Sequence, residues 1–359
     1  MFFDDLPTFP LPDGLRKQWS QYCITVIATG VRVRAAQAKL YDLLRSAGIP
    51  FAILKGTAAA QYYPNPSLRA MGDVDFLVNN TDYEPVQKLL LTDDYMPEGD
   101  DHENPRHVSF QKNGIHFECH RRFAVQRWKN ASLIDSAILS AIPRAGMVND
   151  GTFTFPCLPP AENGLVLLSH VAQHLEEGLG IRQIVDWMMF ADKYLDDNGW
   201  AGVCGQLIRE VGLDSLAKPL TKLCQMYLGL SDRITWCADA DEAVAGSLMQ
   251  LIYHYGNFGQ KAALETTIDT VMIHNHRGFL ANLRVAGEYN WKLLKKYPWL
   301  KPLAPVYQLG RYSAQVIATH GAVSKIIKGK NRVKGKELLL KKRICSAGSL
   351  LPDDLRTPC

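Results

Sequence analysis

Two aspartates inside an apolar run are the residues of this chain best suited to chemistry. Asp73 and Asp75 belong to the run DVDFLV at residues 73–78. Side chains alternate between the two faces of a β-strand, so we expect both carboxylates on one face. Buried carboxylates without partners are costly. A divalent ion with oxygen ligands, such as Mg²⁺, would neutralise them and could also bind substrate phosphates.

A third carboxylate is expected on a neighbouring strand. An Asn-Gly pair at 113–114 separates two alternating runs, residues 107–111 and 115–120, and predicts a β-hairpin. On its second strand, Glu118 and His120 share one face. Glu118 would complete the metal site or act as the base for an attacking hydroxyl, and His120 is a candidate for contact with the metal ligands. Two ions held by such carboxylates suit phosphoryl or nucleotidyl transfer.

A turn suited to phosphate binding precedes the aspartates. The apolar run at 51–54 is followed by Gly56 and Thr57, and then by a predicted helix over 57–63. Gly56 would let the backbone approach an anion, Thr57 would add a hydroxyl, and the helix would offer its first N–H groups. A structural alternative is that Asp73 caps a turn, that Asp75 pairs with Arg69, and that Glu118 lies on a solvated face.

The order of the elements around these residues favours a mixed α/β fold followed by helices. Strand, helix, strand, helix and hairpin succeed one another from residue 51, and the pattern is helical from 161 to about 319. We therefore expect four parts, namely a helical lead-in at 1–48, a catalytic domain at 49–158, a helical domain at 159–324 and a basic tail at 325–359.

The composition is that of an ordinary globular protein. Of the 359 residues, 47% are hydrophobic and 21% charged, and the eight cysteines contain no C-x-x-C pair, which indicates reduced thiols rather than a zinc knuckle. The N-terminus lacks the basic start and continuous apolar stretch of a signal peptide. No apolar run reaches about 18 residues, so we do not expect a membrane span. We expect a cytoplasmic protein.

Positive charge is concentrated near the C-terminus. Residues 325–343 hold nine Lys or Arg against one Glu, in a chain whose net charge is +4. One interpretation is a solvated terminal helix. The other is an electrostatic contact with RNA, a nucleotide or an anionic surface, which makes nucleic acid a possible partner.

Two histidines on one helical segment form another candidate group. His170 and His174 are four residues apart, a spacing that can bind zinc, but the intervening residues lack the glutamate of a zinc hydrolase. The alternative is a pair of hydrogen-bonded histidines. The helical part could still present one of them to the active-site cleft, together with Arg182 and Asp186.

The combined motifs resemble a known superfamily. The strand, Gly-Thr turn, D-x-D strand and later acid are similar to nucleotidyltransferases with the polymerase-beta-like fold. More closely, LKGTAAAQYYPNPSLRAMGDVDFLV, IHFECH and LVLLSHVAQHLEEGLGIRQIVDWMMF resemble a large, mostly uncharacterised bacterial group of nucleotidyltransferase-like proteins. The resemblance covers roughly residues 30–195. It departs from the superfamily in having Thr57 where Ser or Gly is usual, and a long gap between Gly56 and Asp73.

The resemblance implies a fold, a reaction and a set of site residues. The fold would be a small mixed sheet with helices, followed by an all-helical domain. The reaction would move a nucleoside monophosphate from an NTP to an unidentified hydroxyl-type acceptor, using two Mg²⁺ ions, with Mn²⁺ as a possible substitute. The implied metal ligands are Asp73, Asp75 and Glu118, and the implied nucleotide-binding residues are Lys55, Gly56, Thr57 and Arg69.

Two points stay open at this stage. Arg69 could contact phosphate or pair with Asp73. The chain could also be a catalytically silent nucleotide- or partner-binding protein of the same fold, or an RNA-binding protein that uses the basic tail.

Overall fold

A mixed seven-stranded β-sheet forms the centre of the molecule. The computed structural model describes residues 12–98, 106–125, 128–151, 153–177, 179–255, 284, 291, 293–307 and 309–310. The strand order is β3-β4-β5-β2-β1-β7-β6. The strands are β1 (Phe51–Leu54), β2 (Asp73–Val78), β3 (Met96–Glu98), β4 (His107–Lys112), β5 (Ile115–His120), β6 (Gly146–Asn149) and β7 (Thr154–Cys157).

The pairing of the strands brings two distant segments together at the middle of the sheet. Strands β2 and β5 run parallel to each other, as do β1 and β7, whereas β1–β2, β3–β4, β4–β5 and β6–β7 are antiparallel. Asp75 pairs with Leu54 on one side and with Glu118 on the other. The three segments that carry the predicted chemistry therefore lie next to one another.

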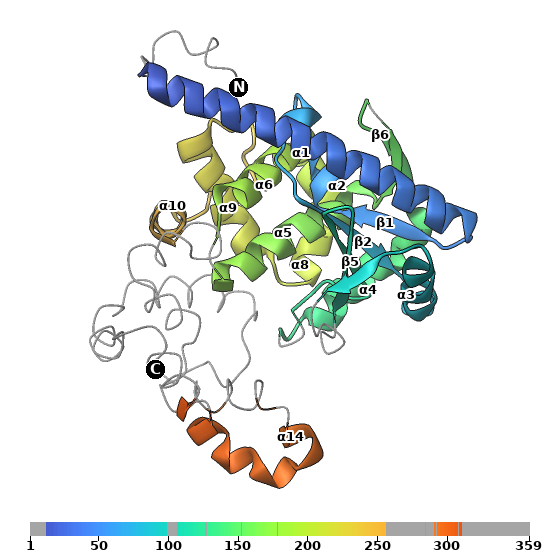
Figure 1. Ribbon diagram of the computed structural model, residues 1–359. Helices are drawn as coiled ribbons and strands as arrows, with labels where there is room; N and C mark the ends of the chain where they lie inside the picture. The colour runs from blue at the N-terminus through green and yellow to red at the C-terminus, as the bar shows by residue number, and fades with distance from the viewer. Residues whose placement is uncertain are drawn as a thin grey trace.

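One face of the sheet packs against α1 (Asp13–Ser46) and α3 (Tyr83–Thr92). Figure 1 shows α1 as a long helix that runs along the sheet. Its buried residues Val33, Leu40 and Leu44 recur at helical spacing and contact a core that includes Phe76 and Phe117. Val74 and Phe76 thus point to the apolar side of β2, which turns Asp73 and Asp75 to the opposite side.

The other face of the sheet packs against the helices that follow it. Leu54 and Leu77 belong to one apolar core with Leu168, Trp187 and Phe190. The helices with residues in this core are α4 (Ala131–Ser140), α5 (Pro160–Glu177), α6 (Ile181–Tyr194), α8 (Gly205–Glu210), α9 (Asp214–Leu228) and α10 (Glu242–Tyr255). The chain also forms α7 (Asp197–Gly199) and the short α14 (Leu293–Lys296). Because sheet and helices share a core, the division at residue 158 stays a prediction.

Several expected elements differ in detail from the structure. The first helix is a single element of 34 residues. The helix after the Gly-Thr turn is only α2 (Gly56–Ala60). The helical pattern expected from residue 161 includes a π-helical turn, Trp200–Cys204, which directly precedes α8. The strands β3 and β6 and the helix α4 were not predicted. Most of the helical pattern expected between residue 256 and about 319, and the whole of the basic tail at 325–359, lie outside the described residues.

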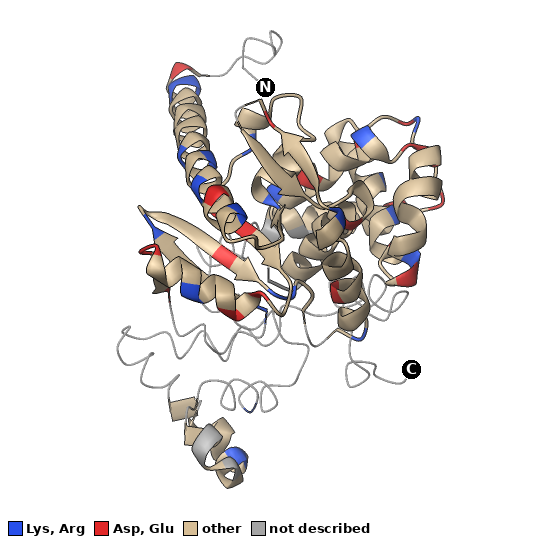
Figure 2. Ribbon diagram, turned by 90° about the vertical axis from the view of Figure 1, so that its right-hand side faces the viewer, with Lys and Arg blue, Asp and Glu red and all other residues tan. Residues whose placement is uncertain are grey.

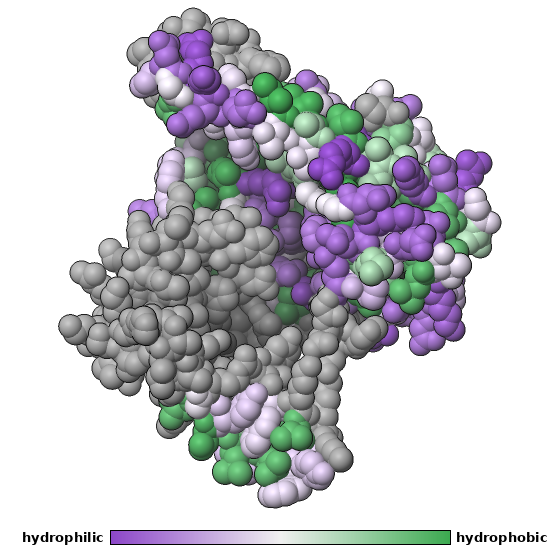
Figure 3. Space-filling view, viewed as in Figure 1, coloured by the Kyte–Doolittle hydropathy of each residue, from purple (hydrophilic) through white to green (hydrophobic). Residues whose placement is uncertain are grey.

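The surface of the described part carries charges of both signs. Figure 2 shows Lys and Arg interspersed with Asp and Glu along the helices. Figure 3 shows hydrophilic residues predominating over the region of α3 and the neighbouring strands. Among the residues that the structure describes, no helix combines the length and the apolar character needed to cross a membrane.

Candidate functional site

The polar side of β2, β4 and β5 meets α5 and α6 at a cavity of about 210 Å³. Three carboxylates, four cationic side chains and four histidines contribute to its wall. The lining residues are Lys55, Gly56, Arg69, Asp73, Asp75, Arg106, His107, Glu118, His120, Phe123, His170, Gln173, His174 and Arg182. The cavity thus collects nearly all of the residues singled out from the sequence.

The three predicted carboxylates lie together. Asp73 and Asp75 leave the same face of β2, and the register of β2 with β5 sets Asp75 opposite Glu118. One ligand oxygen from each residue lies within 4.8 Å of the others. Asp75 is 2% exposed, so its charge needs a partner. The arrangement can hold a cation with oxygen ligands.

In this structure the partners of Asp75 are a lysine and a histidine. Lys55 Nζ lies 2.6 Å from Asp75 Oδ1 and 3.9 Å from Glu118 Oε2. His120 Nε2 lies 3.0 Å from Asp75 Oδ1 and 3.2 Å from Glu118 Oε2. Lys55 lies between β1 and α2 and has φ +46°, a conformation that few non-glycine residues adopt.

Electrostatic coupling dominates the ionisation of this group. The neighbouring charge of Asp75, and then burial, raise the pKa of Asp73. Burial opposes the charge of Lys55 and of His120, but the adjacent carboxylates outweigh it, so the pKa of each is raised. Burial likewise opposes the charge of Glu118, yet its contact with His120 and the charge of Lys55 lower its pKa. Cationic side chains therefore balance the carboxylates.

Arg69 makes a different ion pair from the one expected. Its Nε and Nη2 atoms donate to the two carboxylate oxygens of Asp186 in α6, at 3.1 and 2.7 Å. Tyr63 Oη donates to the same carboxylate at 2.8 Å. The predicted pairing with Asp73 or Asp75 is therefore not found. The two-pronged geometry of the guanidinium matches both oxygens of Asp186 and ties the segment before β2 to α6.

Thr57 does not offer its hydroxyl to the cavity. The residue is 1% exposed, does not line the cavity, and donates from Oγ1 to Gln37 Oε1 of α1 at 2.7 Å. The side chain faces the core beneath α1, and the contact of this hydroxyl with phosphate stays a prediction. Gly56 does line the cavity, with φ +26°.

His170 and His174 line the cavity from the side of α5. Their Nε2 atoms are 2.9 Å apart, a hydrogen-bond distance. Burial, and then the charge of Lys55, lower the pKa of His170 well below its ordinary value, so this imidazole is neutral. Among the described residues neither histidine belongs to a three-membered group of metal ligands. The hydrogen-bonded pair therefore faces the carboxylates without being part of their cluster.

The stretch that builds this cavity matches a known protein family. A family model described as an uncharacterised nucleotidyltransferase matches residues 4–229, well over half of the chain. The chain belongs to this family. Every residue that lines the cavity falls within the matched stretch.

Other comparisons add little to this assignment. No curated protein matches this chain. Among solved structures, it is similar to an antigenic nucleotidyltransferase-like protein from Paracoccidioides brasiliensis, with 16% sequence identity and a TM-score of 0.36, over 56% of this chain and 92% of that one. This likeness is too distant to assign a role to any residue.

Four residues that line the cavity were not singled out from the sequence: Arg106, His107, Phe123 and Gln173. A signal existed for His107, because an Asn-Gly turn sets His107 opposite His120 in the hairpin, as the structure has it. Gln173 precedes His174 on α5. Arg106 Nη1 donates a hydrogen bond to Gln173 Oε1 at 3.1 Å. That contact joins segments 67 residues apart and has no local signal.

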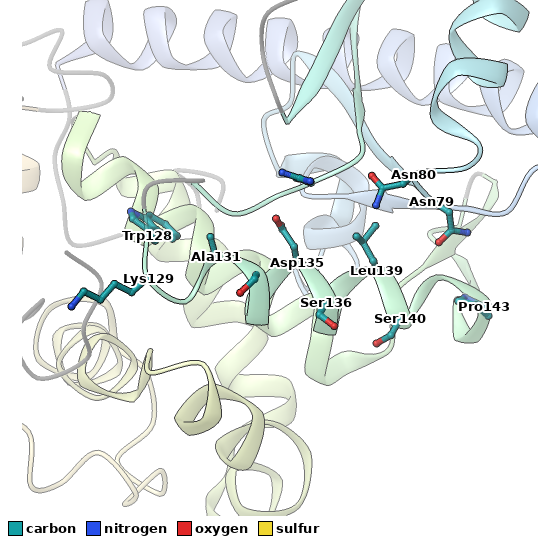
Figure 4. A pocket seen from close by; sticks show the side chains of 12 residues that line it. Asn79, Asn80, Trp128, Lys129, Ala131, Asp135, Ser136, Leu139, Ser140 and Pro143 are labelled. Atoms are coloured by element: carbon teal, nitrogen blue, oxygen red, sulfur yellow. The ribbon is translucent and has the colours of Figure 1, made fainter. Parts of the chain in front are cut away.

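A larger cavity lies elsewhere in the described part of the molecule, and its lining residues include one carboxylate, that of Asp135. It has a volume of about 770 Å³ and is lined by α4 and by Asn79 and Asn80. These two asparagines follow the C-terminal end of β2, whereas Asp73 lies at the N-terminal end of that strand. Figure 4 shows its polar side chains, among them Asp135. Oδ1 of Asp135 accepts hydrogen bonds from the backbone N–H groups of Phe123 and Ala124, both at 2.8 Å. The smaller cavity, which holds the three carboxylates, is therefore the candidate functional site.

The stability of the protein should fall in weakly acidic solution through His107. Burial, and then the charge of His120, lower the pKa of His107 to about 4. An unfolded histidine titrates near pH 6.5, so between these values the unfolded chain binds a proton that folded His107 does not. We expect the difference in unfolding free energy between the wild type and a His107→Gln variant to decrease from about pH 7 to about pH 4.5. Urea denaturation at several pH values measures it, and a constant difference would contradict this linkage.

Proposed function

We propose that this nucleotidyltransferase transfers a nucleoside monophosphate from an NTP to a hydroxyl-type acceptor, with Mg²⁺ as cofactor and pyrophosphate as the leaving group. The observation that carries the proposal is the group formed by Asp73, Asp75 and Glu118, whose ligand oxygens lie within 4.8 Å of one another inside a cavity. Membership of the family supports the reaction class.

The donor set of this group fits a hard divalent ion. Asp73, Asp75 and Glu118 offer only carboxylate oxygens, which Mg²⁺ and Mn²⁺ accept. Two ions bound there would supply positive charge to the transferred phosphoryl group and to the leaving group. Lys55 and His120 occupy the same oxygens in this structure, so ion binding requires them to release part of these contacts. Glu118 serves as a ligand or as the base for the acceptor hydroxyl.

The cationic side chains of the cavity are suited to the triphosphate. Lys55, Arg106 and Arg182 reach the wall from three different segments, and Gly56 leaves room for a phosphate to approach the backbone. Arg69 is held by Asp186 and positions this wall. The volume of about 210 Å³ is below the roughly 300–1,000 Å³ of sites that enclose a drug-sized ligand. We infer that the phosphates and ions fill the cavity, while the nucleoside and the acceptor lie at its opening.

The helices after residue 158 would then contribute to the choice of acceptor. They supply His170, His174 and Arg182 to the cavity. The acceptor is a small molecule, a protein or an RNA, and we propose that the protein acts in the cytoplasm. The basic tail at 325–359 would supply the electrostatic contact if the acceptor is RNA.

The decisive experiment follows nucleotide consumption and the fate of the nucleotidyl group. The full chain is incubated with Mg²⁺, a mixture of the four NTPs, and small-molecule and RNA extracts, and products are identified by mass spectrometry. We expect pyrophosphate release and one nucleoside monophosphate added to an acceptor. An Asp73→Ala/Asp75→Ala double variant should show neither, and equal NTP consumption by both proteins would refute the proposal.

A further inference from the structure

A second group of metal ligands lies beside the three carboxylates and shares one of them. Ligand atoms of His107, Glu118 and His120 all lie within 4.8 Å of one another. We propose that these three residues form a separate site for a transition-metal ion such as Zn²⁺, Mn²⁺ or Fe²⁺. Two imidazoles and one carboxylate are a donor set used by zinc and iron sites, whereas Mg²⁺ prefers oxygen ligands throughout.

The β4–β5 hairpin holds these three side chains in place. His107 pairs with His120 in the antiparallel register, and Glu118 is two residues before His120, so all three leave the same face of the sheet. The turn at Asn113 and Gly114 has φ values of +54° and +72°, which suit a tight two-residue hairpin and fix that register. Ligands carried on paired strands need little rearrangement to bind an ion.

His120 provides an independent reason to expect a ligand at this position. Its side chain is 6% exposed, and its Nε2 atom lies 3.0 Å from Asp75 Oδ1 and 3.2 Å from Glu118 Oε2, so this nitrogen has carboxylate partners. Its Nδ1 atom is buried and has no hydrogen-bond partner within the described structure. Buried imidazole nitrogens normally have a partner, and metal-bound histidines are commonly oriented by a carboxylate on the other ring nitrogen.

Sharing Glu118 would join this site to the oxygen site. One carboxylate oxygen could serve each ion, so that a nitrogen-containing site and an oxygen-only site stand side by side. This site does not depend on nucleotidyl transfer, since it rests on the ligands of the hairpin alone. We therefore expect the protein to bind a transition-metal ion at His107, Glu118 and His120 even when Mg²⁺ is present, because Mg²⁺ prefers the oxygen site.

Cobalt binding by the full-length protein tests the site directly. Chelator-treated protein is titrated with Co²⁺ alone, and binding is followed by visible absorption, which reports nitrogen ligation. We expect His107→Ala to weaken Co²⁺ binding by at least about tenfold. Asp73→Asn should leave Co²⁺ binding within about threefold of the wild type and should abolish competition by Mg²⁺ for the oxygen site.

A matched control is available on the same strand. His116 is half exposed, contacts Glu98 on β3 at 2.6 Å, and lies outside the group, so His116→Ala should bind Co²⁺ like the wild type. If His107→Ala unfolds, His107→Gln serves as the second variant, checked by circular dichroism. Unchanged Co²⁺ affinity in a folded His107 variant, or loss of Co²⁺ binding in Asp73→Asn, would overturn the proposal. A failed NTP assay would leave the cobalt result unaffected, so the two proposals fail separately.

Discussion

Replacing Asp75 with asparagine is expected to lower the rate of Mg²⁺-dependent nucleotidyl transfer by at least about 1,000-fold. Asp75 is the central carboxylate of the cluster, because it shares a strand face with Asp73 and lies opposite Glu118. Asparagine keeps the shape of the side chain but removes the charge that would bind an ion. The rate is measured as pyrophosphate release at saturating Mg²⁺, and Mg²⁺ affinity by calorimetry.

Glu98→Gln is the matched control for this prediction. Glu98 belongs to the same sheet and contacts His116, but it does not line the cavity. Its substitution removes one carboxylate charge from a partly exposed position outside the cavity and should leave the transfer rate within about twofold of the wild type. Comparable rates for Asp75→Asn and Glu98→Gln, with both proteins folded, would show that the cluster does not carry the chemistry.

Local sequence patterns were sufficient to predict the strands that carry the cluster. The alternation around Asp73 and Asp75 predicted a strand over 73–78 with both carboxylates on one face, and the structure has that strand as β2. The Asn-Gly pair likewise predicted the β4–β5 hairpin. Both signals depend on residues within a few positions of each other, where side-chain alternation and turn geometry decide the conformation.

The edge strands had no comparable signal. β3 has three residues and contains Pro97, which normally argues against a strand, and β6 has four residues. These two strands lie at the two edges of the sheet. Proline is acceptable at an edge because its missing N–H faces away from the partner strand. Only knowledge of the strand order, which depends on long-range packing, would have identified them.

Long-range contacts determine the partners of Arg69 and Thr57. Arg69 and Asp186 are separated by 117 residues, so nothing near Arg69 distinguishes this partner from the closer Asp73. The hydroxyl of Thr57 bonds to Gln37, on a helix that precedes the sheet, for the same reason. The sequence could indicate which residue types were present, but the packing of α1 and α6 decided which of them face the cavity.

The pair of Arg69 and Asp186 provides the largest expected effect on stability. Both side chains are buried, at 5% and 2% exposure, and their closest atoms are 2.7 Å apart. Asp186→Ala leaves the guanidinium of Arg69 buried without a counter-ion, and breaking such a pair typically costs about 3–5 kcal/mol of unfolding free energy. Chemical denaturation of the wild type and the variant measures the loss.

A second ion pair on α6 is exposed to solvent, so it tests whether the loss of stability comes from burial or from the loss of charge alone. Asp192 of α6 contacts Arg233 at 3.2 Å, but both side chains are more than half exposed, so Asp192→Ala should cost less than about 1 kcal/mol. An Arg69→Met/Asp186→Leu double variant should recover most of the stability lost in Asp186→Ala, because it leaves no charge unpaired. Equal losses for Asp186→Ala and Asp192→Ala would contradict a buried ion pair. If the double variant folds but transfers nucleotides slowly, Arg69 positions the cavity wall in addition to its contribution to stability.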